Sequence, residues 1–160
     1  MAGKVKILGI DNVMRNLNLE MKKIKGRSLA GLIKAVAEIH RDTEKSPPVT
    51  PADTGNLHAS WFTVTARGQA ISKSPSFTGS EAGERQKDHK SVTGQAKGKV
   101  MGIRDPVVVF GFSANYAGFV HESRAGKKWK RKGSGPRFLE SSINNIKPRI
   151  LAIIASNTKI

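Results

Sequence analysis

An amphipathic helix pattern, ended by three prolines, constrains the fold most. Within residues 29–39 the apolar side chains recur every three or four positions, as on one face of an α-helix: Leu29, Leu32, Ile33, Val36 and Ile39. Pro47, Pro48 and Pro51 follow. Proline lacks an amide hydrogen and clashes with the preceding helical turn. The sequence therefore predicts a helix that buries one face and ends before Pro47.

A second helical stripe precedes this one and consists of Val13, Leu17, Met21 and Ile24. Asp11 stands before it as a candidate N-cap, since a carboxylate can accept a hydrogen bond from a free backbone N–H. Gly26 interrupts the pattern, and Ser28 is a second candidate cap. The sequence thus predicts two helices separated near Gly26, with an edge strand or extended arm over residues 5–10.

Two segments have the composition of β-strands. Residues 61–65 and 107–112 are rich in aromatic and β-branched side chains. The apolar spacing over 116–120 predicts a short helical turn, and the spacing from residue 136 onward predicts a last amphipathic helix. Pro148 lies inside that helix, where proline costs about 3 kcal/mol, so a kink or a break is expected there. Helices flanking a small, mostly antiparallel sheet make an α+β fold.

Residues 66–99 are the least apolar part of the chain, with Phe77 and Val92 as the main apolar anchors. Such a segment is too polar to build a core of its own, which predicts a long loop, a hairpin arm or a disordered insertion. A chain of 160 residues suits one domain. We therefore expect a single structural domain over residues 1–160, with a polar arm or insertion at about 66–99.

The chain carries 28 Lys and Arg against 12 Asp and Glu, a formal net charge of +16. This excess favours nucleic acid, an acidic protein surface or an anionic membrane as partner, although a solvated basic surface also explains it. Cysteine is absent, which excludes disulfides and thiolate chemistry. The N-terminus lacks the apolar region of a signal peptide, and no apolar run approaches the roughly 20 residues of a membrane helix. We expect a soluble, unexported chain with no membrane partner.

No pattern of catalytic or metal-binding residues is evident. The sequence has no HExxH, Walker A, GxSxG or strand-following GxGxxG motif. Glu81, Glu84 and Asp88 have helical spacing but lie in the polar segment, where they suit a solvated surface. The four histidines are also scattered: His40, His58, His89 and His121. We therefore expect no catalytic residue, cofactor, metal or small-molecule substrate, and no enzyme.

Three short motifs stand out instead. Residues 50–60, TPADTGNLHAS, read as a turn from the long helix into a strand, in which Gly55 supplies a positive φ if one is needed. The second motif is Gly111 followed by YAGFVHE, and the third is GPRFLE at the start of the last helix. Their characteristic residues are Pro51, Asp53, Thr54, Gly55, Leu57, Ser60, Gly111, Tyr116, Ala117, Val120, His121, Pro136, Phe138 and Leu139.

In this order the motifs, which span residues 50–140, resemble the siphophage tail-component family of neck and tail-completion proteins. The resemblance implies a structural virion protein without catalytic residues, a ring subunit that joins tail to head around the DNA conduit of a tailed bacteriophage. It would be assembled in the host bacterial cytoplasm. The implied partners are its own copies, with a hexamer expected, adjacent head–tail connector and tail-tube or terminator proteins, and double-stranded DNA in passage. A tail-tube terminator ring is an alternative.

A basic, glycine-rich loop is predicted over residues 124–135. A solvated loop could carry its charges, but their mutual repulsion favours a counter-surface, for which Trp129 could be an anchor. Acidic neighbouring subunits are favoured over the DNA backbone as the partner of this loop, because tight DNA binding would hinder genome passage. Contact with DNA, if the loop made it, would be strongly salt-dependent. A sequence-independent nucleic-acid-binding protein is the rival class. The candidate contact residues are Arg124, Lys127, Lys128, Trp129, Lys130, Arg131 and Lys132.

Overall fold

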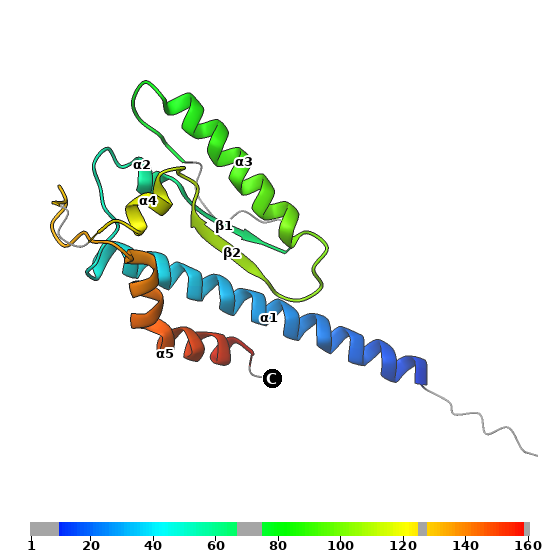
Figure 1. The fold of residues 1–160 in the computed structure, drawn as a ribbon. Coiled ribbons are helices and arrows are strands. Elements are labelled where there is room, and N and C mark those ends of the chain that lie inside the picture. The colour runs from blue at the N-terminus through cyan, green and yellow to red at the C-terminus, as the bar shows by residue number, and fades with distance from the viewer. Residues whose placement is uncertain (1–9, 67–74, 125–127, 159–160) are drawn as a thin grey trace, which may run out of the picture.

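A two-stranded antiparallel sheet lies at the centre of the fold (Figure 1). The computed structural model describes residues 10–66, 75–124 and 128–158. Strand β1 (Trp61–Thr65) pairs with β2 (Val108–Phe112), so that Trp61 lies opposite Phe112 and Thr65 opposite Val108. Because successive side chains of a strand point to opposite faces, each face of this narrow sheet presents its own apolar set.

Helix α3 (Ala82–Val100) covers one face of the sheet. Its buried Ala96 and Val100 pack with Phe62 and Val64 of β1, and the partly buried Val92 joins the same cluster. The other face is covered by α1 (Ile10–Lys45) and α5 (Phe138–Thr158), which lie against each other. Three layers result, in which the sheet separates α3 from α1 and α5.

The second core cluster lies between β1, α1 and α5. Trp61 is its buried aromatic residue, with Val36 and Ile39 of α1 beside it. The indole also stacks on His40, with ring centroids 4.3 Å apart. Strand β2 and helix α5 complete the cluster with partly buried side chains: Val108, Phe110, Phe112, Leu139, Ile143, Ile146 and Ile150.

The α+β fold class and its main elements are confirmed. Strand β1 has the predicted bounds, β2 begins one residue later than predicted, and α1 ends at Lys45, before the prolines. Two short helices, α2 (Asn56–Ala59) and α4 (Ala117–His121), complete the structure, the latter at the predicted helical turn. The described part of the basic segment contains no helix, as expected.

The prediction of a break near Gly26 is wrong, because α1 is one helix of 36 residues. Ser28 caps nothing; its hydroxyl donates to the carbonyl oxygen of Ile24 at 3.0 Å, inside the helix. Asp11 likewise lies within the helix, which begins at Ile10, and residues 5–9 lie outside the described part. One glycine costs only about 1 kcal/mol in a helix, which is too little to interrupt a helix of this length.

The prediction of a loop, arm or disordered insertion over 66–99 is also wrong for residues 82–99, which belong to α3. Their apolar stripe is narrow, since it consists of Val92, Ala96 and Val100. Side chains of β1 and β2 nevertheless pack against it. His89, at the start of the same stripe, is buried and its Nδ1 lies 2.7 Å from the Ser113 hydroxyl. The polar composition therefore reflects the solvent-exposed side of a helix.

Helix α5 continues through Pro148 but changes direction along its length, as Figure 1 shows. The predicted kink is confirmed. None of the described helices combines the length and apolar character needed to cross a lipid bilayer.

Gly31 is where α1 and α5 approach each other closely. A Cβ atom at this position would lie 3.2 Å from Cβ of Asn157 and 3.3 Å from Cα of Ile154. Gly31→Leu is expected to force α5 away and lower the free energy of unfolding by about 1–3 kcal/mol, as measured by urea denaturation. Gly26→Leu in the same helix is the control. A Cβ there meets nothing within 4 Å, so it should be neutral or stabilising, and equal losses from both variants would contradict the close packing.

Candidate functional site

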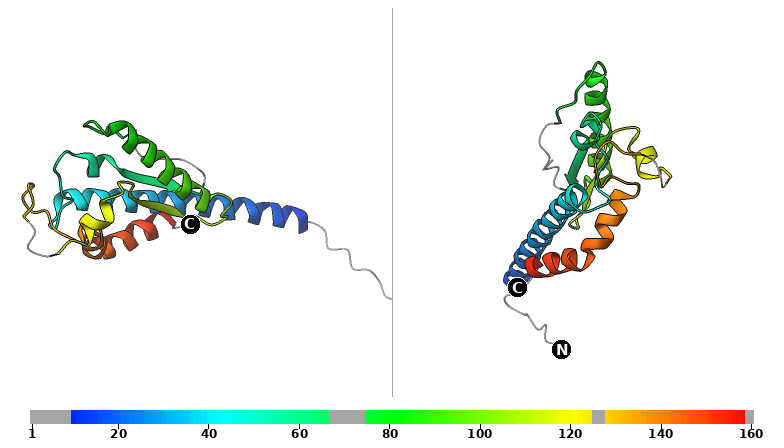
Figure 2. Two further views of the ribbon diagram at one scale, coloured as in Figure 1. Left: turned by 45° about the horizontal axis from the view of Figure 1, so that its top comes forward. Right: turned by 90° about the vertical axis from the view of Figure 1, so that its left-hand side faces the viewer.

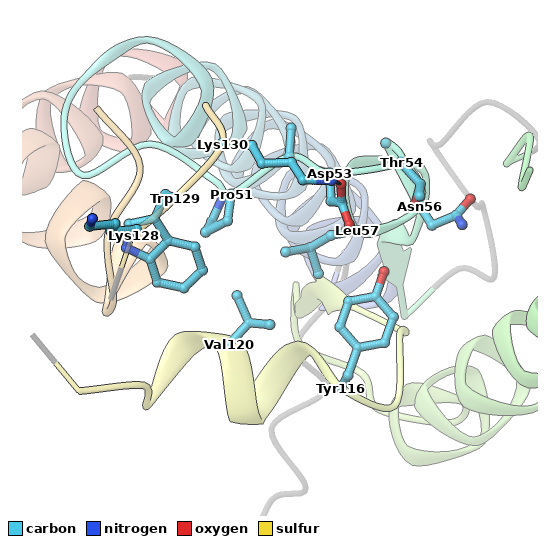
Figure 3. A pocket seen from close by; sticks show the side chains of 12 residues that line it. Pro51, Asp53, Thr54, Asn56, Leu57, Tyr116, Val120, Lys128, Trp129 and Lys130 are labelled. Carbon is cyan, nitrogen blue, oxygen red and sulfur yellow. Dashed lines mark hydrogen bonds and ion pairs between the residues drawn. The ribbon is translucent and has the colours of Figure 1, made fainter. Parts of the chain in front are cut away.

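The end of the molecule where α1 stops carries a groove (Figure 3). It encloses about 310 Å³ between residues 51–57, two side chains of the second motif and residues 128–130 of the basic loop. Pro51, Leu57, Val120 and Trp129 surround its apolar part, and Tyr116 closes one side. The fold thus brings two of the three motifs and the basic loop to one surface.

The first wall of the groove is the turn that follows α1. The amide of Thr50 donates to the carbonyl oxygen of Thr43 at 2.7 Å, which folds the chain back after the prolines. Gly55 has φ 82° and precedes α2, so the positive φ anticipated for this glycine is present. The Asn56 side chain then accepts from the Thr78 amide at 2.8 Å and donates to the Thr78 carbonyl at 3.1 Å. Backbone geometry and side-chain bonds together fix this wall.

The basic loop is tied to α1 through Arg131. Its guanidinium donates to the Glu44 carboxylate at 3.0 Å and to the Glu44 carbonyl oxygen at 2.7 Å. His58 Nδ1 lies 2.8 Å from the same carboxylate. Backbone contacts reinforce the attachment, since the amide of Val49 donates to the Gly133 carbonyl at 2.9 Å. Arg131 therefore has a structural role within the subunit.

Glu44 is ionised in this cluster. Its burial raises the pKa of the carboxyl group, but hydrogen bonds from His58 and Arg131 outweigh burial and hold the pKa below its ordinary value. The carboxylate neutralises Arg131, so the loop presents less positive charge to a partner than its sequence indicates. Neither Glu44 nor His58 was identified as a functional candidate from the sequence, where a glutamate near a helix end gives no sign of a partner 87 residues away.

The other candidate cations of the loop are exposed. Lys130 forms an ion pair with Asp53 across the edge of the groove, and Lys128 lies on its rim beside Trp129. Arg124 and Lys132 are also exposed, but they do not line the groove. Lys127 lies outside the described residues.

The remaining motif residues build the subunit. Gly111 faces the ring of Phe62 across the sheet, and the buried Ser60 hydroxyl donates to the Leu57 carbonyl oxygen at 2.7 Å. Phe138, 1% exposed, packs edge-on against His121 and Phe112. The others lie away from the groove: Ala117 in α4, Pro136 just before α5, and Leu139 in the second core cluster.

No group of three His, Cys, Asp or Glu side chains within the described residues could hold a metal ion. His40 and His89 instead occupy structural positions, stacked on Trp61 and bonded to Ser113. Burial lowers the pKa of both imidazoles below their ordinary value of 6.5. For His40, Glu44 opposes this shift and His58 adds to it.

The lowered pKa values of His40 and His89 predict that the fold is less stable in acid. A depressed folded-state pKa means that the unfolded chain binds protons first, so stability is greatest above about pH 6.5 and falls as pH is lowered. The urea midpoint is expected to drop from about pH 7 to pH 5. His40→Phe keeps an aromatic ring against Trp61 without a titrating group, and should make that decline shallower. An unchanged slope in this variant would contradict the assignment to His40.

A second surface lies at the opposite end of α1. The N-terminal half of the helix projects beyond the sheet (Figure 2), and its apolar stripe is exposed, with Val13 at 66%, Leu17 at 53% and Met21 at 47%. We call these three residues the α1 stripe.

No protein-family model, no curated protein and no solved structure matches the chain. The groove and the α1 stripe are therefore the features from which a function can be argued.

Proposed function

We propose that this chain is a structural subunit of a tailed bacteriophage virion, which assembles into a ring at the neck or tail-completion position. The ring joins the tail to the head and surrounds the DNA conduit. The α1 stripe is the observation that carries this proposal. The resemblance of the three ordered motifs to neck and tail-completion proteins supports the proposed position in the virion.

The α1 stripe is suited to subunit contact because it is apolar, regular and uncovered. Val13, Leu17 and Met21 follow one another at four-residue intervals, which aligns them on one helical face. Fully burying a large apolar side chain contributes about 1.5–3 kcal/mol, so the stripe offers several kcal/mol to an interface. A surface of this kind on a projecting helix can contact the body of the next copy, and repeated head-to-tail contacts form a ring when the rotation between copies closes.

Two measurements test this proposal. Native mass spectrometry of the purified full chain is expected to show a closed oligomer, with six copies expected. Gold-labelled antibodies on purified virions are expected to mark the junction between head and tail in electron micrographs. A chain that stays monomeric at all concentrations and is missing from the particle would defeat the proposal. Labelling at the far end of the tail tube would instead indicate a position other than the neck.

The exposed cations Arg124, Lys128 and Lys132 favour a second candidate, a sequence-independent nucleic-acid-binding protein. The formal charge of +16 would supply its affinity. A mobility shift at moderate salt separates the two candidates. Tight DNA binding by an isolated monomer would favour the second, whereas an oligomer with negligible binding would favour the structural ring.

A further inference from the structure

We propose that the groove binds an acidic peptide segment of another protein, with an apolar side chain of the peptide between Leu57, Val120 and Trp129 and a carboxylate on Lys128. This goes beyond the proposed ring, because one subunit forms the entire groove. The segments that line the groove lie near the C-terminal end of α1, whereas the residues of the α1 stripe belong to its N-terminal half (Figure 1).

The shape of the groove fits a peptide side chain. Its volume of about 310 Å³ is at the lower end of the roughly 300–1,000 Å³ of ligand pockets. Figure 3 shows Val120 and Trp129 on either side of a hollow, with Pro51 and Leu57 above it. Apolar side chains with a few polar groups at the edge are typical of sites that seat one anchor residue.

The rim of the groove carries positively charged side chains that can bind a carboxylate. Lys128 is exposed, and among the described residues it has no ion-pair partner. Lys130 pairs with Asp53, but their side chains are 77% and 66% exposed, and such a surface pair contributes only about 0–1 kcal/mol. Lys130 can therefore exchange Asp53 for a carboxylate of the peptide. The net charge of the chain attracts an acidic segment from a distance.

Tyr116 adds a neutral donor on the side away from the lysines. Burial raises the pKa of its phenol, an effect that Arg85 opposes and Asp53 reinforces. The hydroxyl group therefore keeps its proton near neutral pH and can donate to a peptide carbonyl oxygen. An extended peptide, which carries a carbonyl at every residue, uses such a donor whatever its side chains.

A nucleic-acid strand fits the groove less well. Its phosphates would meet the carboxylate of Asp53 beside Lys130, and Arg131 is already occupied by Glu44. Backbone recognition requires several cations in a row. The mixed charge of the rim and the aliphatic walls formed by Leu57 and Val120 favour a peptide.

The walls of the groove are fixed before any partner binds. Arg131 holds the basic loop on α1, and residues 49 and 134 form a parallel bridge. Gly135 sits so close to Pro48 that a Cβ atom there would lie 2.9 Å from the proline Cβ. Binding to a preformed groove requires little ordering of the protein, which favours affinity.

Fluorescence anisotropy with short labelled peptides tests the inference on the full chain. A peptide in which leucine alternates with glutamate is expected to bind, while the matching peptide with lysine for glutamate does not. Lys128→Glu should weaken binding about tenfold, because it replaces one favourable ionic contact with a repulsive one. Val120→Trp should abolish binding, because the larger side chain fills the hollow.

Lys132→Glu is the matched control, since it makes the same charge change in the same loop outside the groove, and it should leave the affinity within about twofold. If Lys128→Glu and Lys132→Glu weakened binding equally, the affinity would depend on the overall charge of the chain and not on the groove. That result would overturn the inference. Tighter binding of oligothymidylate than of the acidic peptide, lost in the same variants, would replace it with nucleic-acid recognition. An intact oligomer that binds no acidic peptide would overturn the inference while leaving the proposed ring in place.

Discussion

Phe138→Ala is expected to lower the free energy of unfolding by about 3–5 kcal/mol. The ring is 1% exposed and packs edge-on against Phe112 at 5.5 Å and His121 at 5.1 Å between centroids. It therefore holds the start of α5 against both β2 and α4. Its removal leaves a cavity at a point where three elements meet, and the surrounding backbone can collapse only partly. Urea denaturation followed by tryptophan fluorescence measures the loss directly.

Leu151→Ala in the same helix provides the control, because it truncates an apolar side chain that is 61% exposed. Surface substitutions of this kind usually change stability by less than about 0.5 kcal/mol. If the two variants lost similar stability, the phenylalanine of the third motif would not be the anchor of α5. The comparison also tests whether this motif residue acts through the subunit core rather than through a partner.

The elements predicted best from the sequence are those that local chemistry determines. Prolines at 47, 48 and 51 end α1 whatever lies around them, and the aromatic and β-branched composition of residues 61–65 is enough to indicate a strand. The order of helices and strands follows, and with it the α+β class. Proline at 148 also predicts the bend of α5, because the missing amide hydrogen is a local property.

The misassigned segment that forms α3 depends on contacts that are distant in sequence. Residues 82–100 have a weak apolar stripe, and only the sheet face formed by Phe62 and Val64 makes that stripe a core. Gly26 lies inside α1, because the roughly 1 kcal/mol that one glycine costs is too small to break a helix of 36 residues. For α3, tertiary packing outweighs local propensity.

The candidate site was predicted in part. Residues 51–57, Tyr116 and Val120 were singled out as motif positions, and residues 128–130 as a basic segment, but nothing in the sequence placed them around one groove. Arg131 was grouped with its lysine neighbours by charge alone. Its bond to Glu44 distinguishes it from them, since a planar guanidinium can bind a carboxylate and a carbonyl oxygen together.

Leu17→Glu is expected to convert the assembled protein into monomers at concentrations where the unaltered chain is oligomeric. The substitution places a carboxylate in the middle of the α1 stripe, where it would lose its hydration on contact with an apolar surface. A cost of about 3 kcal/mol per interface corresponds to an association constant lower by on the order of 100-fold. Sedimentation velocity over a range of concentrations measures the change.

Leu19→Glu in the same helix separates the effect of the stripe from that of charge or helix stability. Leu19 is 50% exposed and Leu17 is 53% exposed, but two positions along an α-helix are roughly 200° apart around its axis, so they face opposite sides. Both variants add one negative charge and exchange residues of similar helix propensity. The Leu19 variant should therefore remain assembled. If both variants dissociate, or neither does, the α1 stripe is not the subunit interface, and the proposed ring would need another contact surface.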